Sequence, residues 1–147
     1  MVQVLVAVGV MTVAAATGLV LRRRRVVEAP TQARHGIPAQ LDRADFAPDV
    51  PWVVVVFTSA TCSTCADVHR KAQVLTSPQV AVIEVEFTTA RALHSKYAID
   101  AVPILAIAGP DGVVRAGFAG PVTATDLWAA VAEARNPGAS PEPDLGR

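Results

Sequence analysis

The residues best suited to chemistry in this chain are its two cysteines, Cys62 and Cys65, which are separated by two residues. A thiolate attacks disulfides, and a second thiol beside it can close a disulfide or release a bound partner. Residues 52–57 form an uncharged apolar run typical of a buried strand, and residues 66–75 form a helix-length segment. The Cys-x-x-Cys pair is therefore expected where a strand leads into a helix.

This position favours a reactive thiol. A helix N-terminus stabilises an anion, because its first N–H groups are unpaired and its dipole is positive there. Cys62 is expected at the first helical position and should ionise more easily than a free thiol. Thr61 is available as the helix N-cap, and the spacing brings Cys65 beneath Cys62 by nearly one turn. We interpret the pair as redox-active, the alternatives being a static disulfide or two unrelated buried cysteines.

Composition excludes several other classes of site. The chain has 13 basic and 13 acidic residues, but four of the basic ones are consecutive arginines at 22–25. The remainder is therefore acidic, and no nucleic-acid partner is expected. Two cysteines are too few for a disulfide-stapled scaffold or a four-cysteine zinc site. Because His35, His69 and His94 lack metal-site spacing, neither a metal nor another cofactor is expected.

The N-terminal end predicts a membrane anchor. Residues 2–21 carry no charge and are long enough to cross a bilayer as a helix. A cleaved signal peptide is the alternative, although it lacks the usual positive region before the apolar run. The arginines at 22–25 favour a cytoplasmic position for everything that follows, with the extracytoplasmic side as the alternative. The expected organisation is an anchor (1–21), a basic juxtamembrane linker (22–38), a folded domain (39–135) and a disordered tail (136–147).

The folded domain continues with alternating strands and helices. A strand is expected over residues 80–87 with Glu84 and Glu86 on its more polar face, followed by a helix over 90–97 capped by Thr88 or Thr89. Residues 104–108 and 113–118 flank a turn signal and predict an antiparallel hairpin. A final helix opens at 123–126. Its expected apolar stripe contains Leu127, Trp128, Val131 and Ala134.

Taken in this order, residues 40–135 resemble the thioredoxin family. The resemblance is carried by the apolar run 53–57, by Cys62-Ser63-Thr64-Cys65, by Tyr-x-Ile-x-x-Val-Pro at 97–103 and by Asp-Gly at 111–112 before Gly117. It implies an α/β thioredoxin-like fold with a central mixed sheet flanked by helices. It also implies that Pro103 is the family's cis-proline and that the backbone of Val102 pairs with an extended substrate peptide. The predicted substrate-binding residues are Thr61, Val102 and Pro103.

The chain departs from the classical family pattern at several positions. Thr61 replaces the usual tryptophan, and Ser63-Thr64 replaces Gly-Pro. Val56 stands where the family has a buried carboxylate, whose lysine neighbour falls near Val82. Deprotonation of the resolving thiol would then need water or another group, such as Glu84 or Glu86.

Two further residue types receive ordinary structural interpretations. His69 lies two turns beyond Cys62, so it is expected as a surface or half-buried helix residue rather than a base, and His94 is interpreted in the same way. Trp52 and Trp128 are expected to pack in the core or at its rim. Segment 39–46 offers either an edge strand through Leu41 or a helical turn against Phe46.

These features predict a membrane-anchored thiol-disulfide oxidoreductase that reduces protein disulfides. Cys62 would attack the substrate and Cys65 would resolve the mixed disulfide. The partners are protein disulfide or dithiol substrates, an unidentified electron donor and the membrane. The alternatives are an extracytoplasmic thioredoxin-like protein of the cytochrome-maturation type and a thioredoxin-fold binding or assembly module whose cysteine pair is not catalytic.

Overall fold

The computed structural model describes residues 36–138. The predicted membrane anchor, most of the basic linker and most of the predicted tail lie outside these residues. Between residues 36 and 138, no helix has the length and apolar character that crossing a membrane requires.

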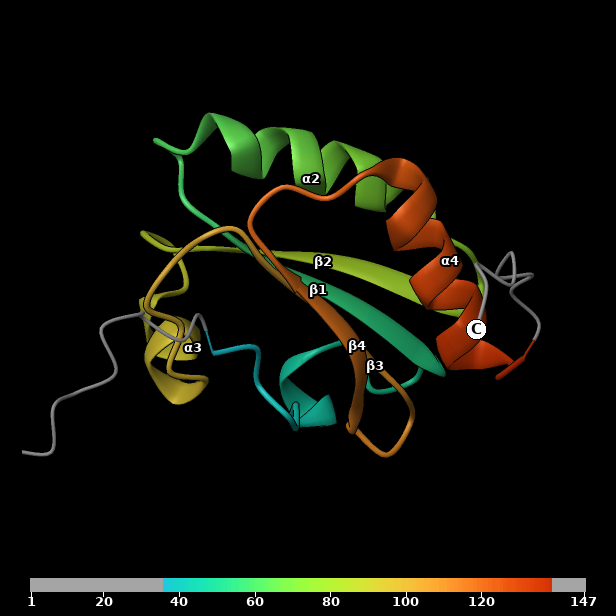
Figure 1. Ribbon diagram of the computed structural model, residues 1–147. Helices are drawn as coiled ribbons and strands as arrows, with labels where there is room; N and C mark the ends of the chain where they lie inside the picture. Colours follow the sequence, from blue (N-terminus) through green and yellow to red (C-terminus); the bar gives the residue numbers. More distant parts are fainter. Residues whose placement is uncertain (1–35, 139–147) are drawn as a thin grey trace, which may run out of the picture. The chain divides into compact units, whose positions relative to one another are not determined.

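A four-stranded mixed sheet forms the centre of the domain. Its order is β2 (Val80–Glu86), β1 (Trp52–Thr58), β3 (Ile104–Ala108) and β4 (Val114–Ala119). β1 pairs in parallel with β2 and antiparallel with β3, and β3 pairs antiparallel with β4, as the predicted hairpin requires (Figure 1). All but the first residue of β1 are buried, because this strand is covered on both faces.

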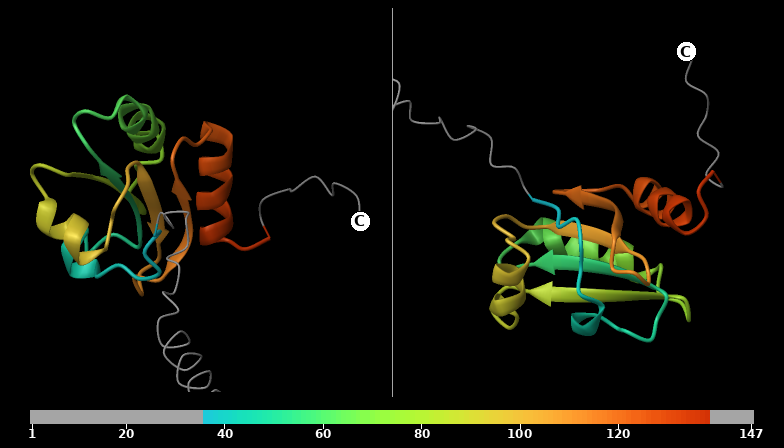
Figure 2. Two further views of the ribbon diagram at one scale, coloured as in Figure 1. Left: turned by 60° about the vertical axis from the view of Figure 1, so that its left-hand side comes forward. Right: turned by 90° about the horizontal axis from the view of Figure 1, so that it is seen from below.

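Helices cover both faces of the sheet. α2 (Ser63–Gln73) and α4 (Ala124–Arg135) share one hydrophobic cluster and lie on the same face. The other face is covered by α3 (Arg91–Lys96) and by the segment that contains the 3-10 helix η1 (Arg43–Asp45). Figures 1 and 2 show this arrangement of two helix layers around one sheet.

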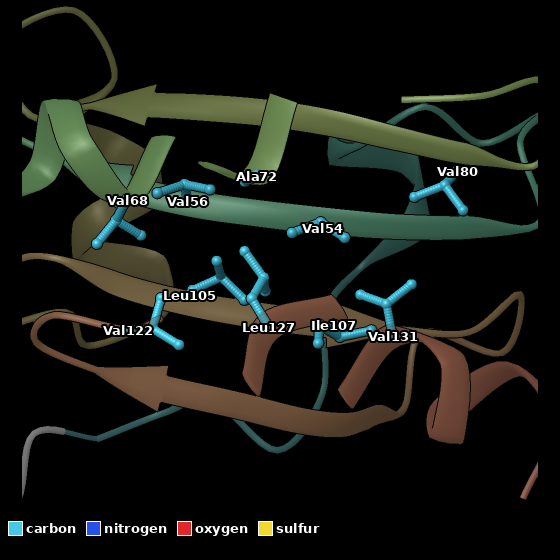
Figure 3. Close-up of a cluster of buried hydrophobic side chains, with 10 residues drawn as sticks. All are labelled: Val54, Val56, Val68, Ala72, Val80, Leu105, Ile107, Val122, Leu127 and Val131. Carbon is cyan, nitrogen blue, oxygen red and sulfur yellow. The ribbon is translucent and has the colours of Figure 1, made fainter. Parts of the chain in front are cut away.

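The cluster beneath α2 and α4 is entirely apolar. Alternate residues of a strand point to opposite faces, so Val54 and Val56 of β1 enter this cluster together. Burial of each such side chain stabilises the fold by about 1.5–3 kcal/mol. Figure 3 shows the members: Val54, Val56, Val68, Ala72, Val80, Leu105, Ile107, Val122, Leu127 and Val131.

The N-terminal segment uses both of the structures that its sequence left open. Gln40 forms an isolated antiparallel bridge with Val113, and η1 follows immediately. Leu41 and Phe46 are both 1% exposed and enter the cluster on the α3 face. The Leu41 N–H donates to the Gly112 carbonyl at 2.8 Å. Gly112 has φ +74°, and a Cβ there would lie 2.1 Å from the Leu41 oxygen, so this turn requires glycine.

The predicted stripe of α4 is wrong at Trp128. Leu127 and Val131 are buried, and Ala134 packs against them, but Trp128 is 45% exposed. Each helical residue is rotated by about 100° from the one before it, so the helix cannot direct both 127 and 128 into the same core. The other tryptophan, Trp52, packs against the cluster at its rim, as predicted.

The threonines before α3 do not cap it. Its N-cap position is Ala90, which makes no side-chain capping bond. Thr88 and Thr89 instead donate their backbone N–H groups to the Glu86 carboxylate, at 2.9 and 3.1 Å. The Glu86 carboxylate at the end of β2 therefore binds the polar groups of this turn, and neither threonine caps α3.

Candidate functional site

The two cysteines form a disulfide at the start of α2. Their sulfurs are 2.10 Å apart and their Cα atoms 5.3 Å apart. Cys62 has extended backbone angles and is itself the N-cap residue, with its sulfur accepting the Cys65 N–H at 3.1 Å. The helix begins at Ser63, one residue after the expected first helical position at Cys62.

The expected N-cap role of Thr61 is wrong, because the Cys62 sulfur occupies that role. Thr61 is exposed, and its hydroxyl lies 3.3 Å from that of Ser59 in the same loop. Its predicted contact with substrate is compatible with this exposure and stays a prediction.

The two sulfur-bearing residues differ in burial. Cys62 is partly exposed, whereas Cys65 is 1% exposed and faces the sheet. An external disulfide can therefore approach Cys62 more easily than Cys65. Cys62 also lies at the positive end of α2, where a thiolate is stabilised.

Glu86 holds the loop that carries the cysteines. One of its carboxylate oxygens accepts the N–H of Ala60 at 3.1 Å, and the other accepts the N–H groups of Thr88 and Thr89. Hydrogen bonds from the Thr88 hydroxyl and then from these backbone groups lower the pKa of Glu86 from 4.5 to about 2. Glu86 is therefore an anion in neutral solution, committed to the turn rather than available to accept a proton.

The predicted proline loop lies at the same end of the sheet. The Val102–Pro103 bond is cis, as the resemblance implies. Pro103 is buried, and its carbonyl accepts the Gly120 N–H at 2.9 Å. β3 begins one residue later, where Ile104 pairs with Phe57 near the end of β1. The loop of Cys62 leaves β1 immediately beyond this point.

A cavity of about 210 Å³ lies beside this loop. It brings Ser59, from the segment before the cysteines, together with Val102. Its complete lining is Ser59, Phe87, His94, Ile99, Asp100, Ala101 and Val102. Of the three predicted substrate-binding residues, Val102 therefore faces a cavity of the size of a side chain.

A polar cluster lies between α2 and the sheet. The His69 Nδ1 atom is 3.3 Å from one carboxylate oxygen of Glu84, and the other oxygen accepts the Thr58 hydroxyl at 2.8 Å. Thr58 is buried, and the side chain of His69 is only 20% exposed. The half-buried location predicted for His69 is thus confirmed.

The sheet register places a carboxylate beside Val56. The residue opposite Val56 on β2 is Glu84, not Val82, which pairs with Val54. Glu84 and Val56 consequently project from the same face, toward α2. On α2, the four-residue spacing of Cys65 and His69 places these two residues on one helix face.

His94 is more deeply buried than its ordinary interpretation suggested. It is 2% exposed, and its Nε2 atom lies 2.9 Å from the Val85 carbonyl oxygen. The rings of Phe57 and Phe87 contact it edge to face, with centroids at 5.3 and 5.2 Å. The role that these contacts support is packing of α3 against the sheet.

Within the described part of the chain, no group of three or more His, Cys, Asp or Glu side chains could hold a metal ion. The chemistry that this arrangement can perform with its own groups is thiol-disulfide exchange. One accessible and one buried sulfur lie at a helix N-terminus, next to a cis-proline loop.

Comparison with solved structures identifies the fold as thioredoxin-like. The thioredoxin of Fasciola hepatica is 22% identical, with a TM-score of 0.51, over 59% of this chain and 84% of that chain. A mutant thioredoxin from Halobacterium salinarum NRC-1 is also 22% identical, with a TM-score of 0.50, over 62% of this chain and 80% of that one. No family model matches the chain, and no curated protein matches it.

Proposed function

We propose that this chain is a thiol-disulfide oxidoreductase that reduces disulfides in protein substrates. The observation that carries the proposal is the Cys62–Cys65 disulfide at the N-terminus of α2, with Cys62 partly exposed and Cys65 buried. The thioredoxin-like fold and the cis-proline loop at the same end of the sheet support it.

The proposed reaction has three steps. The Cys62 thiolate attacks a substrate disulfide, forms a mixed disulfide and releases one substrate thiolate. Cys65 loses its proton and attacks the Cys62 sulfur, which releases the second substrate thiolate and forms the Cys62–Cys65 disulfide. A dithiol electron donor then reduces this disulfide by the same exchange chemistry and is itself oxidised.

Insulin reduction tests this function. The purified full chain should accelerate the reduction of insulin by dithiothreitol, which is followed as precipitation of the separated chains. The Cys62→Ser variant should not, because the attacking thiolate is absent. A wild-type chain that leaves the uncatalysed rate unchanged would indicate a binding or assembly module with a non-catalytic cysteine pair.

We propose further that residues 2–21 anchor the domain in a membrane, with the domain on the cytoplasmic side. The basis is the uncharged run followed at once by four arginines. Alkaline phosphatase and green fluorescent protein, fused separately after Arg135, distinguish the two orientations. Fluorescence without phosphatase activity is expected. Phosphatase activity without fluorescence would place the domain outside and favour a role of the cytochrome-maturation type.

A further inference from the structure

The buried position of Cys65 poses a chemical problem for the proposed exchange reaction, on which this inference rests. Cys65 must lose its proton before it can attack, but an apolar environment disfavours a charged thiolate. Val56, on the neighbouring part of β1, is fully buried and has no polar group to offer. Glu86 is committed to the loop and turn N–H groups.

His69 is placed to act on this thiol. It follows Cys65 by four residues on α2, a spacing that makes two side chains neighbours on a helix surface, with Cβ atoms about 5–6 Å apart. The helix face that contains both residues is directed toward the sheet, since Cys65, Val68 and Ala72 are all buried there. His69 is thus the histidine of α2, and it shares a helix face with the resolving cysteine.

Glu84 and Thr58 orient this imidazole. The Glu84 carboxylate lies 3.3 Å from Nδ1 and favours the tautomer that carries its proton on that atom. The same carboxylate is held from the other side by the Thr58 hydroxyl at 2.8 Å. Nε2 then retains the lone pair that can accept a proton.

We infer that His69 is the proton acceptor for Cys65 during resolution of the mixed disulfide, and that Glu84 is its positioning residue. The Cys65 S–H proton moves to His69 Nε2 as the sulfur attacks Cys62, the substrate sulfur leaves with the electron pair of the broken disulfide, and the imidazolium then gives its proton to that thiolate or to water. No external oxidant or reductant is consumed in this step.

Glu84 is the charged residue that contacts His69, and the other charged residues of the neighbouring elements bind different groups. β1 contains no charged residue, and Glu86 of β2 binds backbone N–H groups. The other ionisable residues of α2 pair with one another, Asp67 with both Arg70 and Lys71. The charged residues of α4 bind elsewhere: Asp126 to Thr123, Glu133 to the Gly138 N–H, and Arg135 to Gln79.

A reaction with one equivalent of dithiobis(nitrobenzoate) separates the two thiol steps in the reduced full chain. Attack by Cys62 releases a first thionitrobenzoate, and attack by Cys65 on the resulting mixed disulfide releases a second, so stopped-flow absorbance gives both rates. In His69→Gln, the second phase should be slower by about tenfold or more near neutral pH, while the first is unchanged. The difference should become smaller as the pH rises, because hydroxide can then remove the Cys65 proton without the imidazole.

Two further variants sharpen the test. Glu84→Gln should slow the second phase less than His69→Gln, because it removes the negative charge beside the imidazole and leaves the imidazole itself. Arg70→Gln, on the same helix with a side chain that is 73% exposed, should change neither phase. Thermal unfolding of each variant reports whether the fold is retained.

Three results would overturn the inference. One is a second phase in His69→Gln equal to that of the wild type at every pH. Another is equal slowing of both phases, which would indicate a structural effect of the substitution. If the wild-type chain releases no second thionitrobenzoate at all, the proposed exchange reaction is wrong. The proposed role of His69 is then wrong as well.

Discussion

Replacing Cys65 by serine is expected to leave substrate proteins covalently attached to Cys62. The buried thiol that resolves the mixed disulfide is then missing, and Cys65 is the only other cysteine in the chain. Cells that express Cys65→Ser should show adducts on non-reducing gels, and dithiothreitol should remove them. Mass spectrometry of these bands would identify the substrates.

The matched variant is Cys62→Ser, which should trap nothing because the accessible attacking sulfur is gone. Adducts on Cys62→Ser but not on Cys65→Ser would reverse the two roles. If neither variant forms adducts while the wild-type chain still captures a partner without a covalent bond, the chain is a binding module and not an exchange catalyst.

The second large effect concerns stability. Leu127→Ala should lower the free energy of unfolding by about 2–5 kcal/mol, because it removes a fully buried side chain from the cluster between α4 and the sheet. Chemical denaturation of the reduced and oxidised proteins measures this loss. Part of this loss is the favourable free energy that the deleted carbon atoms gain when folding moves them from water into the core, and the rest comes from the cavity that the neighbouring side chains cannot fill.

The adjacent residue supplies the control. Trp128→Ala removes a much larger side chain, but one that is 45% exposed, so the loss should stay below about 1 kcal/mol. A cost for Trp128→Ala as large as that for Leu127→Ala would mean that this tryptophan is buried against something outside the described residues.

Local patterns were sufficient to predict the order of the elements. The valines of β1, the Cys-x-x-Cys pair and the Gly-Pro-Asp-Gly turn between β3 and β4 each express a preference that acts over a few residues. The structure confirms the central strand, the helix after the cysteines, the antiparallel hairpin and the final helix. The start of the helix after the cysteines was predicted one residue too early, because the capping atom is a cysteine sulfur, and cysteine is not among the usual N-cap residues.

Long-range packing decided what the patterns left open. Leu41 and Phe46 had too few apolar neighbours in sequence to be assigned, but both are buried through the pairing of their segment with Gly112 and Val113. Trp128 was assigned to the wrong side of its helix because an apolar side chain does not by itself specify the face that meets the core.

The same division applies to the site. The sequence by itself determined the reactive pair. Cys62 and Cys65 are three positions apart at the start of a helix, and this local geometry alone brings their sulfurs together. Only the tertiary structure decided which carboxylate meets His69. Glu84 and His69 are fifteen residues apart in the chain and come together because β2 pairs with β1 in the register that sets Glu84 opposite Val56 beneath α2. A shift of one residue in that register would turn the carboxylate to the other face of the sheet, and no local preference in the sequence specifies it.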